Sequence, residues 1–375
     1  MATPSGRFIV APRDRAEQVS AESASGTIAG PMFPASLIVL AVILLVVGAG
    51  LFFLVSFLMA RVLLMPERME GGRAMLALQR LTPKDLDLPY EETFFTVRDE
   101  WAARRGRAGA TLAVAAWWIP AAHNAGKCAV IVHGYSDSKI GGIAWAPTFR
   151  ALGYNVLAID LRAHGRSDGT YSTAGYWERH DVSQVIDQLR QLQPAATRQL
   201  VLFGVSLGAA TVCATAELRQ CRDVAAVIMD CPYSDYPSAA MTHGDALGMP
   251  GTYFQRLGIR IAERLSGARF LEVAPTALIP RVACPLMVIH GADDLFITAH
   301  DMDSVEAATR SRPAELGHTD YWRPDKTHHV LALRTDPGEF RRRVGEFLEA
   351  ALRSPLPDAP ERAARVEASS RLGEG

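Results

Sequence analysis

The sequence is poor in cysteine, and this scarcity excludes several classes of protein. Only five of the 375 residues are cysteine. They form no CxxC pair, and none has the spacing from histidine that zinc sites need, which argues against a disulfide framework and a structural metal. Cys128, Cys213 and Cys284 lie in or beside apolar runs, where a thiol behaves as a small hydrophobe. We expect these thiols to be buried in a core, and we expect no metal site.

The chain also carries almost no net charge and lacks nucleotide-binding motifs. The formal net charge is −1, so no global field attracts nucleic acid or acidic substrates. The chain has no GxGxxG motif and no other glycine-rich loop of the kind that cradles phosphate. These absences predict a protein that needs no cofactor and has no nucleic-acid partner.

Charged residues are absent from one long segment. Residues 35–60 form a run of 26 residues without a charged side chain, and at about 1.5 Å per residue a helix of that length crosses the hydrocarbon core of a bilayer. A soluble helix rarely stays apolar on every face for so long. The apolar part of a cleaved signal peptide is shorter, at about 7–15 residues. We therefore expect a retained single transmembrane helix, with the membrane as a partner of the chain.

The arginines beside this segment predict its orientation. Arg61, Arg68, Arg73 and Arg80 follow the segment closely, whereas only Arg15 lies as near on the other side. Positive charge concentrates on the cytoplasmic side of membrane helices, so the large C-terminal part is expected in the cytoplasm. Five cysteines, an odd number, agree with a reducing compartment.

Composition divides the rest of the chain. Residues 1–31 are rich in Ala, Ser, Gly and charges and have little to bury, so they read as a flexible tail. Residues 61–90 form a polar connector with some helical character, and residues 353–375 lack apolar periodicity and are expected to be disordered. The globular domain is therefore expected at residues 91–352.

Within this domain, short apolar runs alternate with helical stretches such as Glu178–Leu192 and Pro337–Leu352. The short runs lack inside-outside alternation, which is typical of strands buried on both faces of a mostly parallel sheet. We predict an α/β fold with helices on both faces of the sheet, whose active groups lie at the carboxyl ends of the strands. The predicted strands are Thr93–Val97, Leu112–Ile119, Ala129–Val132, Asn155–Ile159, Gln199–Phe203, Ala225–Met229 and Leu286–Ile289.

A long insertion separates the sixth and seventh predicted strands. Residues 231–280 contain methionines, aromatic residues and a helical run. Insertions at the active edge of such a sheet commonly form the wall of the substrate pocket. We expect this segment to form a small cap over the site.

The run Gly204–Gly208 reads GVSLG and joins the fifth predicted strand to a helix-favouring segment. A sharp turn from strand to helix requires small residues on both sides, because the chain folds tightly around the serine backbone. Such a turn exposes the serine hydroxyl beside a helix N-terminus, whose free N–H groups favour negative charge. The pattern GxSxG alone is weak, but the strand before it and the helix after it indicate that Ser206 is a nucleophile.

A serine nucleophile needs a base, which an acid in turn orients. The seventh predicted strand is followed by HGADD, which places Asp293 and Asp294 at the active edge, and the later run KTHHV contains His328 and His329. The order Ser, Asp, His is the one in which hydrolase sheets supply these groups. The pattern leaves open which aspartate and which histidine act, and Asp230 at the end of the sixth strand is another candidate acid.

Two further motifs complete a familiar set. The third predicted strand runs into HGY, which ends at Tyr135, and the fourth is followed by DLRAHGRS from Asp160 to Ser167. With GVSLG and the segment Ile279–Gly291, they make the chain resemble the α/β-hydrolase superfamily, in particular its lipase-, esterase- and serine-aminopeptidase-like branch. The resemblance covers about residues 94–352. It implies an α/β-hydrolase fold with a small cap, here preceded by one transmembrane helix.

The resemblance also implies residue roles. Ser206 matches the nucleophile, Asp294 the acid and His329 the base. Asp294 is favoured over Asp293 because the family's acid is normally fifth counting from the histidine of the HG pair. A departure from the family is that His328, rather than a glycine, precedes the base.

Two backbone N–H groups, those of Tyr135 and Leu207, are expected to form the oxyanion hole. His133 and His164 are expected to hydrogen-bond the backbone rather than to take part in catalysis. The predicted activity is hydrolysis of carboxylic esters, among them lipid-like esters or acyl thioesters because of the membrane helix. Two alternatives stay open: a peptidase or amidase that uses the same residues, and a non-catalytic, membrane-tethered binding protein.

Overall fold

The computed structural model describes residues 34–123, 126–221, 223–249 and 251–353. The described chain divides into two compact units, with the boundary between Ala49 and Gly50. The two predicted tails lie outside the described residues, apart from Arg353.

The charge-free segment forms a single helix, α1 (Ala35–Leu64). This helix is long and apolar enough to cross a membrane, and none of its most apolar stretch is buried; a signal sequence near an N-terminus has the same properties. The helix continues beyond the predicted end at residue 60 because its last turn belongs to the domain. Ala60 and Leu64 are both fully buried there.

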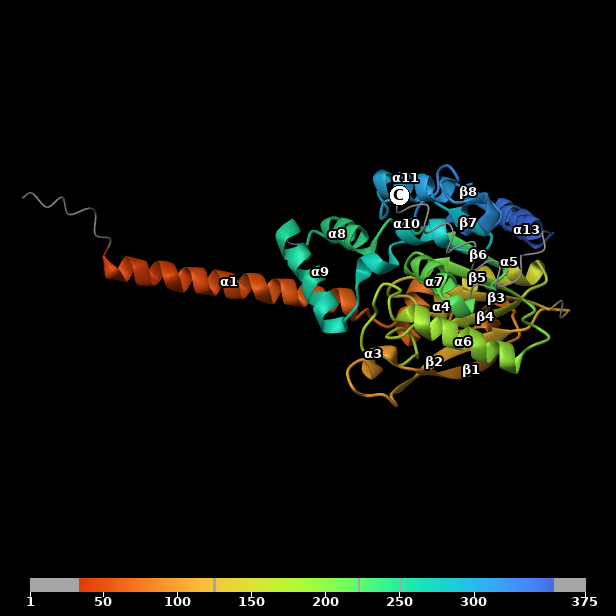
Figure 1. Ribbon diagram of the computed structural model, residues 1–375, viewed down its shortest axis with the longest axis horizontal. Helices are drawn as coiled ribbons and strands as arrows, with labels where there is room; N and C mark the ends of the chain where they lie inside the picture. Colours follow the sequence, from red (N-terminus) through yellow and green to blue (C-terminus); the bar gives the residue numbers. More distant parts are fainter. Residues whose placement is uncertain (1–33, 124–125, 222, 250, 354–375) are drawn as a thin grey trace, which may run out of the picture. The chain divides into compact units, whose positions relative to one another are not determined.

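The domain is built on an eight-stranded sheet in the order β1-β2-β4-β3-β5-β6-β7-β8 (Figure 1). The β1–β2 and β2–β4 pairs are antiparallel, and the other five pairs are parallel. The predicted mostly parallel α/β sheet is therefore confirmed. The strands are β1 (Glu91–Arg98), β2 (Thr111–Ile119), β3 (Lys127–Val132), β4 (Asn155–Ile159), β5 (Gln199–Val205), β6 (Ala226–Asp230), β7 (Leu286–Ile289) and β8 (Thr319–Trp322).

The central strands form where the apolar runs predicted them, because both faces of the sheet are covered. Every residue of β4, β6 and β7 is buried. β5 extends two residues beyond its predicted end, as far as Val205. β8 was not predicted: it reads TDYW, and only Trp322 is buried, so an edge strand of this length carries too little apolar pattern to be recognised.

Helices cover the sheet in two layers. α6 (Glu178–Leu192), which matches its predicted bounds, packs with α7 and α11 in one apolar cluster, while α5 and α13 belong to the cluster on the other face. The other elements outside the insertion are α2 (Gly71–Leu78), η1 (Pro83–Leu86), α3 (Glu100–Ala103), α4 (Lys139–Gly142), η2 (Ile143–Trp145), α5 (Ala146–Ala151), α7 (Leu207–Glu217), η3 (Arg219–Cys221), α11 (Ala299–Arg310), η6 (Ala314–Leu316), α12 (Ala332–Thr335) and α13 (Pro337–Arg353).

The insertion between β6 and β7 is mainly helical. Its C-terminal part is fixed to the domain, since the indole N–H of Trp177, the residue before α6, donates to the Ser266 carbonyl at 3.0 Å. The insertion contains α8 (Tyr236–Ala246), α9 (Thr252–Ser266), η4 (Phe270–Val273), α10 (Pro275–Leu278) and η5 (Ile279–Arg281).

A buried ion pair fixes the loop that follows β4. Nζ of Lys139 lies 2.5 Å from a carboxylate oxygen of Asp160, and both side chains are almost fully buried. The same carboxylate accepts the backbone N–H of Lys139 at 2.6 Å and that of Arg166 at 2.9 Å. Nearby, the Ser167 hydroxyl donates to the Asp160 carbonyl at 2.7 Å. The DLRAHGRS motif thus shapes the turn itself.

Replacing Lys139 by methionine should destabilise the domain by about 3 kcal/mol, because it leaves the Asp160 carboxylate buried without a counter-charge. Thermal or urea unfolding of the purified protein measures this. Lys84→Met, at an exposed lysine on η1, is the control and should leave the midpoint unchanged. A Lys139→Met protein as stable as the wild type would contradict this account of the loop.

Candidate active site

Ser206 lies at the junction of β5 and α7 in a backbone conformation that L-residues seldom adopt. Its φ is 52° and its ψ is −112°. Its backbone N–H donates to the Asp230 carbonyl at 2.8 Å, which ties the turn to the end of β6. The serine is partly exposed although its neighbours Val205 and Leu207 are buried. This strained turn between a strand and a helix is the geometry that the GVSLG pattern predicts.

The two glycines of the pattern are required by close backbone contacts. A Cβ on Gly204 would lie 2.7 Å from the backbone nitrogen of Ala209, and a Cβ on Gly208 would lie 2.6 Å from the His133 carbonyl oxygen. Neither obstacle is a flexible side chain. Glycine at position 204 thus lets α7 fold back on β5, and glycine at position 208 lets α7 approach the end of β3.

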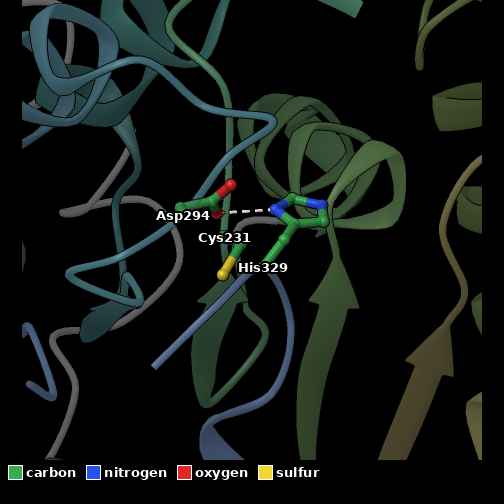
Figure 2. A group of neighbouring side chains, drawn as sticks. All are labelled: Cys231, Asp294 and His329. Atoms are coloured by element: carbon green, nitrogen blue, oxygen red, sulfur yellow. Dashed lines mark hydrogen bonds and ion pairs between the residues drawn. The ribbon is translucent and has the colours of Figure 1, made fainter. Parts of the chain in front are cut away.

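His329 and Asp294 form a direct pair at the same end of the sheet. Nδ1 of His329 lies 2.6 Å from one carboxylate oxygen of Asp294, and Figure 2 shows the other ring nitrogen pointing away from the carboxylate. The second carboxylate oxygen accepts the backbone N–H groups of Phe296 at 2.8 Å and Ile297 at 2.9 Å. The Asp294 side chain is fully buried, while that of His329 keeps 17% of its surface exposed. The ring is thus held by a buried acid and still reachable.

The electrostatics of Asp294 follow from these contacts. Burial by itself raises the pKa of a carboxyl group, but the hydrogen bond and charge of His329, together with the two backbone N–H groups, outweigh it. The pKa of Asp294 therefore lies below its ordinary value. At neutral pH the carboxylate is ionised and is able to stabilise positive charge on the imidazole.

The other two candidates from the sequence have different surroundings. His328 is exposed, and its Nδ1 lies 2.8 Å from the backbone carbonyl of Asp293. Asp293 is itself exposed, and among the described residues its side chain makes no ion pair.

Strand pairing brings Ser206 to the edge where His329 and Asp294 lie. Val205 pairs with Asp230 across β5 and β6, and Asp230 pairs with Ile289 across β6 and β7. Cys231 follows Asp230, and its Sγ lies within 4.8 Å of ligand atoms of both His329 and Asp294. Within the described residues, no hydrogen bond joins Ser206 to His329.

Two free backbone donors lie beside the serine. The peptide before Tyr135 comes close to the turn, since a Cβ on Gly134 would lie 3.6 Å from that of Ser206. Within the part of the chain that the structure describes, neither the N–H of Tyr135 nor that of Leu207 donates a hydrogen bond. The hydroxyl of the Tyr135 side chain donates to the Val62 carbonyl of α1.

Comparisons with known proteins agree with this architecture. Residues 123–268 match the family model described as serine aminopeptidase, S33. The chain is 26% identical to the uncharacterized protein YqkD of Bacillus subtilis over 232 residues, 61% of this chain and 73% of that protein. It is 27% identical to the uncharacterized protein YfhR of Escherichia coli K12 over 245 residues, 63% of this chain and 76% of that one.

Among solved structures, the Pyrococcus furiosus esterase Pf2001 matches with a TM-score of 0.58 and 22% identity, over 76% of this chain and 97% of the esterase. The acylaminoacyl peptidase of Pyrococcus horikoshii matches with a TM-score of 0.50 and 16% identity, over 78% of this chain and 46% of the peptidase. At these identities the two structures establish the fold. The chain has the α/β-hydrolase fold and is similar to serine hydrolases of that superfamily. The resemblance inferred from its motifs is confirmed.

The histidines of the HG and AHG motifs have structural surroundings in this hydrolase. Nδ1 of His133 lies 2.7 Å from the Gly134 carbonyl, and its Nε2 accepts the Leu161 N–H at 3.0 Å. Nδ1 of His164 lies 2.9 Å from the Arg162 carbonyl. Burial lowers the pKa of His133 to about 4 and that of His164 to about 3. Both rings are neutral at physiological pH, and the expected backbone hydrogen bonds are confirmed.

Cys231, Asp294 and His329 come close enough to suggest a metal site (Figure 2). The thiol, however, is buried, and burial first and the nearby carboxylates next raise its pKa well above the ordinary value. A metal-binding cysteine must be a thiolate. The other two groups already bind each other, and Sγ accepts the Val330 N–H at 3.2 Å. This cluster therefore fits a hydrogen-bonded pair better than a resident ion. All five cysteine side chains of the hydrolase are buried, as the apolar runs predicted for three of them.

Asp230 is the unusual residue of the site. It is fully buried, and neither of its carboxylate oxygens has a hydrogen-bond partner among the described residues. Burial raises its pKa to about 7, against smaller opposing effects of the neighbouring Cys231 thiol and then of His329. The sequence singled out this residue only as an alternative acid, because a strand end does not reveal whether a carboxylate will be paired.

The raised pKa of Asp230 makes the stability of the hydrolase depend on pH. Between pH 4 and 7, approximately, the unfolded chain has lost this proton and the folded chain has kept it, so stability falls as pH rises. Asp230→Asn removes this dependence. The variant should gain thermal stability relative to the wild type at pH 8, and gain less at pH 5. Unfolding midpoints measured across this range test the prediction, with Asp325→Asn, at an exposed aspartate, as the control. An equal effect of Asp230→Asn at both pH values would contradict it.

Proposed function

We propose that this hydrolase cleaves carboxylic esters with Ser206 as nucleophile, His329 as base and Asp294 as the acid that orients the base. The observation that carries the proposal is the His329–Asp294 pair, with an Nδ1-to-carboxylate distance of 2.6 Å, at the edge of the sheet where the strained Ser206 turn lies. A hydroxyl at its ordinary pKa is a poor nucleophile, and a base oriented in this way is what such a hydroxyl requires.

The reaction follows the acyl-enzyme sequence. His329 takes the Ser206 proton as the hydroxyl oxygen attacks the ester carbonyl, and the ionised Asp294 stabilises the imidazolium that forms. Protonated His329 then gives its proton to the leaving alcohol. Water attacks the acyl-enzyme with His329 again as base, which releases the acid and restores the serine.

The backbone N–H groups of Tyr135 and Leu207 form the oxyanion hole in this proposal. Support comes from the finding that neither donates elsewhere among the described residues, and that the Gly134 backbone lies against Ser206. Leu207 is also the first residue of α7, where N–H groups lack partners within the helix. One donor of this kind contributes about 3 kcal/mol to stabilisation of the transition state.

Apolar side chains beside the base favour an acyl chain in the substrate. The ring of Phe296 packs against that of His329 with centroids 5.4 Å apart, and Phe296 and Leu295 remain exposed. The ring of His243 in α8 also packs on Phe296, with a centroid distance of 5.1 Å. The insertion thus reaches the base and acts as a cap in this proposal. Together with α1 as a membrane anchor, these contacts favour lipid-like esters or thioesters.

A peptidase is the second candidate, because the family model that matches residues 123–268 is described as serine aminopeptidase. The proposed residues would cleave an amide by the same steps, with protonation of the leaving nitrogen by His329. Hydrolysis rates on p-nitrophenyl esters of graded chain length, beside aminoacyl anilides, decide between the two. Faster turnover of anilides than of any ester would replace the ester proposal by the peptidase.

Substitutions at the proposed residues should abolish activity selectively. Ser206→Ala should remove both labelling by a fluorophosphonate and ester turnover. His329→Ala should do nearly the same, and Asp294→Asn should lower kcat by about 10⁴-fold. Labelling assays and kcat measurements on folded protein provide the test.

The chain contains matched controls for two of these changes. His328→Ala and Asp293→Asn remove the neighbouring side chains, which are exposed, and should keep most of the activity. An adduct that persists in Ser206→Ala overturns the nucleophile. Absence of any adduct on folded wild type favours a non-catalytic binding protein instead.

The proposed location is a membrane, with α1 as a single span and the domain on the cytoplasmic side. The length and apolarity of α1 support the span, and the arginines that follow it support the orientation. Reporters attached to each terminus test both. A domain found outside the cytoplasm would overturn the orientation, and release of the intact chain into the soluble fraction would overturn the span.

A further inference from the structure

The insertion helix α9 is packed directly on the C-terminal part of α1. The rings of Phe52 and Phe254 lie with centroids 4.6 Å apart. Gly258 comes so close that a Cβ there would lie 3.0 Å from the Ser56 carbonyl oxygen and 3.2 Å from Cβ of Met59. Figure 1 shows α9 against this end of α1. The last turns of the anchor helix and the helix that follows α8 are therefore one packed body.

The position of this contact along α1 gives the depth of α9 in a membrane. About 20 helical residues cross the hydrocarbon core, and the charge-free run from residue 35 supplies them by residue 54. The contacts at Ser56 and Met59 come after that point and before Arg61, the first charged residue. If α1 spans the bilayer, α9 lies at the level of the lipid headgroups.

The side of α9 that faces away from α1 carries three arginines. Arg256, Arg260 and Arg264 are spaced four residues apart, so they share one side of the helix, and all three are exposed. Arg260 is two residues from Gly258, which at 3.6 residues per turn places it on the opposite side of the helix. None of the three forms an ion pair among the described residues, in contrast to Arg269, which lies 2.8 Å from Glu272.

We propose that α9 is an interfacial helix whose three arginines bind the phosphates of anionic lipids in the leaflet next to the domain. Tyr253 at the start of the helix is 78% exposed, and its amphipathic ring is of the kind enriched at membrane interfaces. An arginine near an anionic surface strengthens membrane attraction about five-fold. Lipid headgroups fix α9 at the interface, and α8, whose His243 ring packs on Phe296 beside the base, is held there with it. The inference rests on the proposed membrane attachment, and it places the substrate entrance at the bilayer surface.

The experiment uses the full chain in nanodiscs. A dye is attached at Thr252→Cys, because Thr252 is exposed whereas the five native cysteines are buried. Quenching of the dye by lipids that carry a nitroxide near the headgroup is compared in discs of phosphatidylcholine alone and with about 30% phosphatidylglycerol. Quenching should increase about two-fold in the anionic discs and return to the neutral value at high salt, because salt screens the attraction.

Charge reversal identifies the arginines that cause the effect. Arg256→Glu/Arg260→Glu should lose the extra quenching in anionic discs. The control Arg334→Glu/Arg341→Glu reverses two exposed arginines that belong to α12 and α13 and should retain it. Equal thermal unfolding midpoints in detergent show that each variant is folded.

Two results would overturn the proposal. One is equal quenching of the dye in neutral and anionic discs. The same result is expected if the three arginines bind an acidic protein instead of lipid. The other is unchanged quenching in the Arg256→Glu/Arg260→Glu protein. Fluorophosphonate labelling of the wild type in detergent is independent of lipid, so failure of the proposed hydrolase activity would be recognised separately.

Discussion

The close approach of two backbone segments governs this molecule. Gly208, at the start of α7, lies against the carbonyls at the end of β3, and no side chain fits between them. That contact bends the chain after β5 so sharply that Ser206 takes a positive φ. The strain is retained because β5 is hydrogen-bonded on both sides, to β3 and to β6, and its residues are almost all buried. A stable sheet thus holds one serine in a conformation that the residue alone would avoid.

Around this turn, buried ionisable side chains are either ionised and hydrogen-bonded or kept uncharged by burial. Asp294 is ionised, with both oxygens occupied by donors. Asp230, one strand away, has no hydrogen-bond donor within the described part of the chain, and burial raises its pKa. His133 is neutral because it is buried. The result is a site in which the carboxylate next to His329 is the ionised acid, although a second one is close by. The pKa values of these two aspartates differ because their surroundings differ.

Much of the fold could be predicted from the sequence, since its signals are local. The central strands are continuous apolar runs, and the turn at Ser206 follows from glycines at fixed positions. β8 was missed because a strand of four residues at an edge has almost no pattern. The arrangement of the site was harder to predict from the sequence. Sequence spacing left Asp293 or Asp294 and His328 or His329 open until the family resemblance was used, because neighbouring residues differ only in direction, which tertiary packing decides.

Contacts between distant segments lay beyond the sequence altogether. Nothing in residues 231–280 indicates that Gly258 would pack on Ser56, because a glycine in a helix has many uses. The same is true of Phe296, whose ring contacts His329. The motifs predict only that the loop containing Phe296 supplies the acid. Amphipathic periodicity gives the side of a helix that is covered, but not the element that covers it.

The end of α1 has a practical meaning for preparing this protein. Three of its last carbonyls serve the domain: Val62 accepts from Tyr135, Leu63 from Tyr236 at 3.2 Å, and Leu64 from the Ser172 N–H at 2.7 Å. Trimming the chain at the first arginine after the apolar run would remove the fully buried Ala60 and the helical turns that hold these carbonyls in position. A shortened fragment would therefore have to keep the C-terminal turns of α1, and the apolar side chains of those turns would be exposed at its N-terminus. The last turns of α1 are therefore a structural part of the domain, and not only an extension of it.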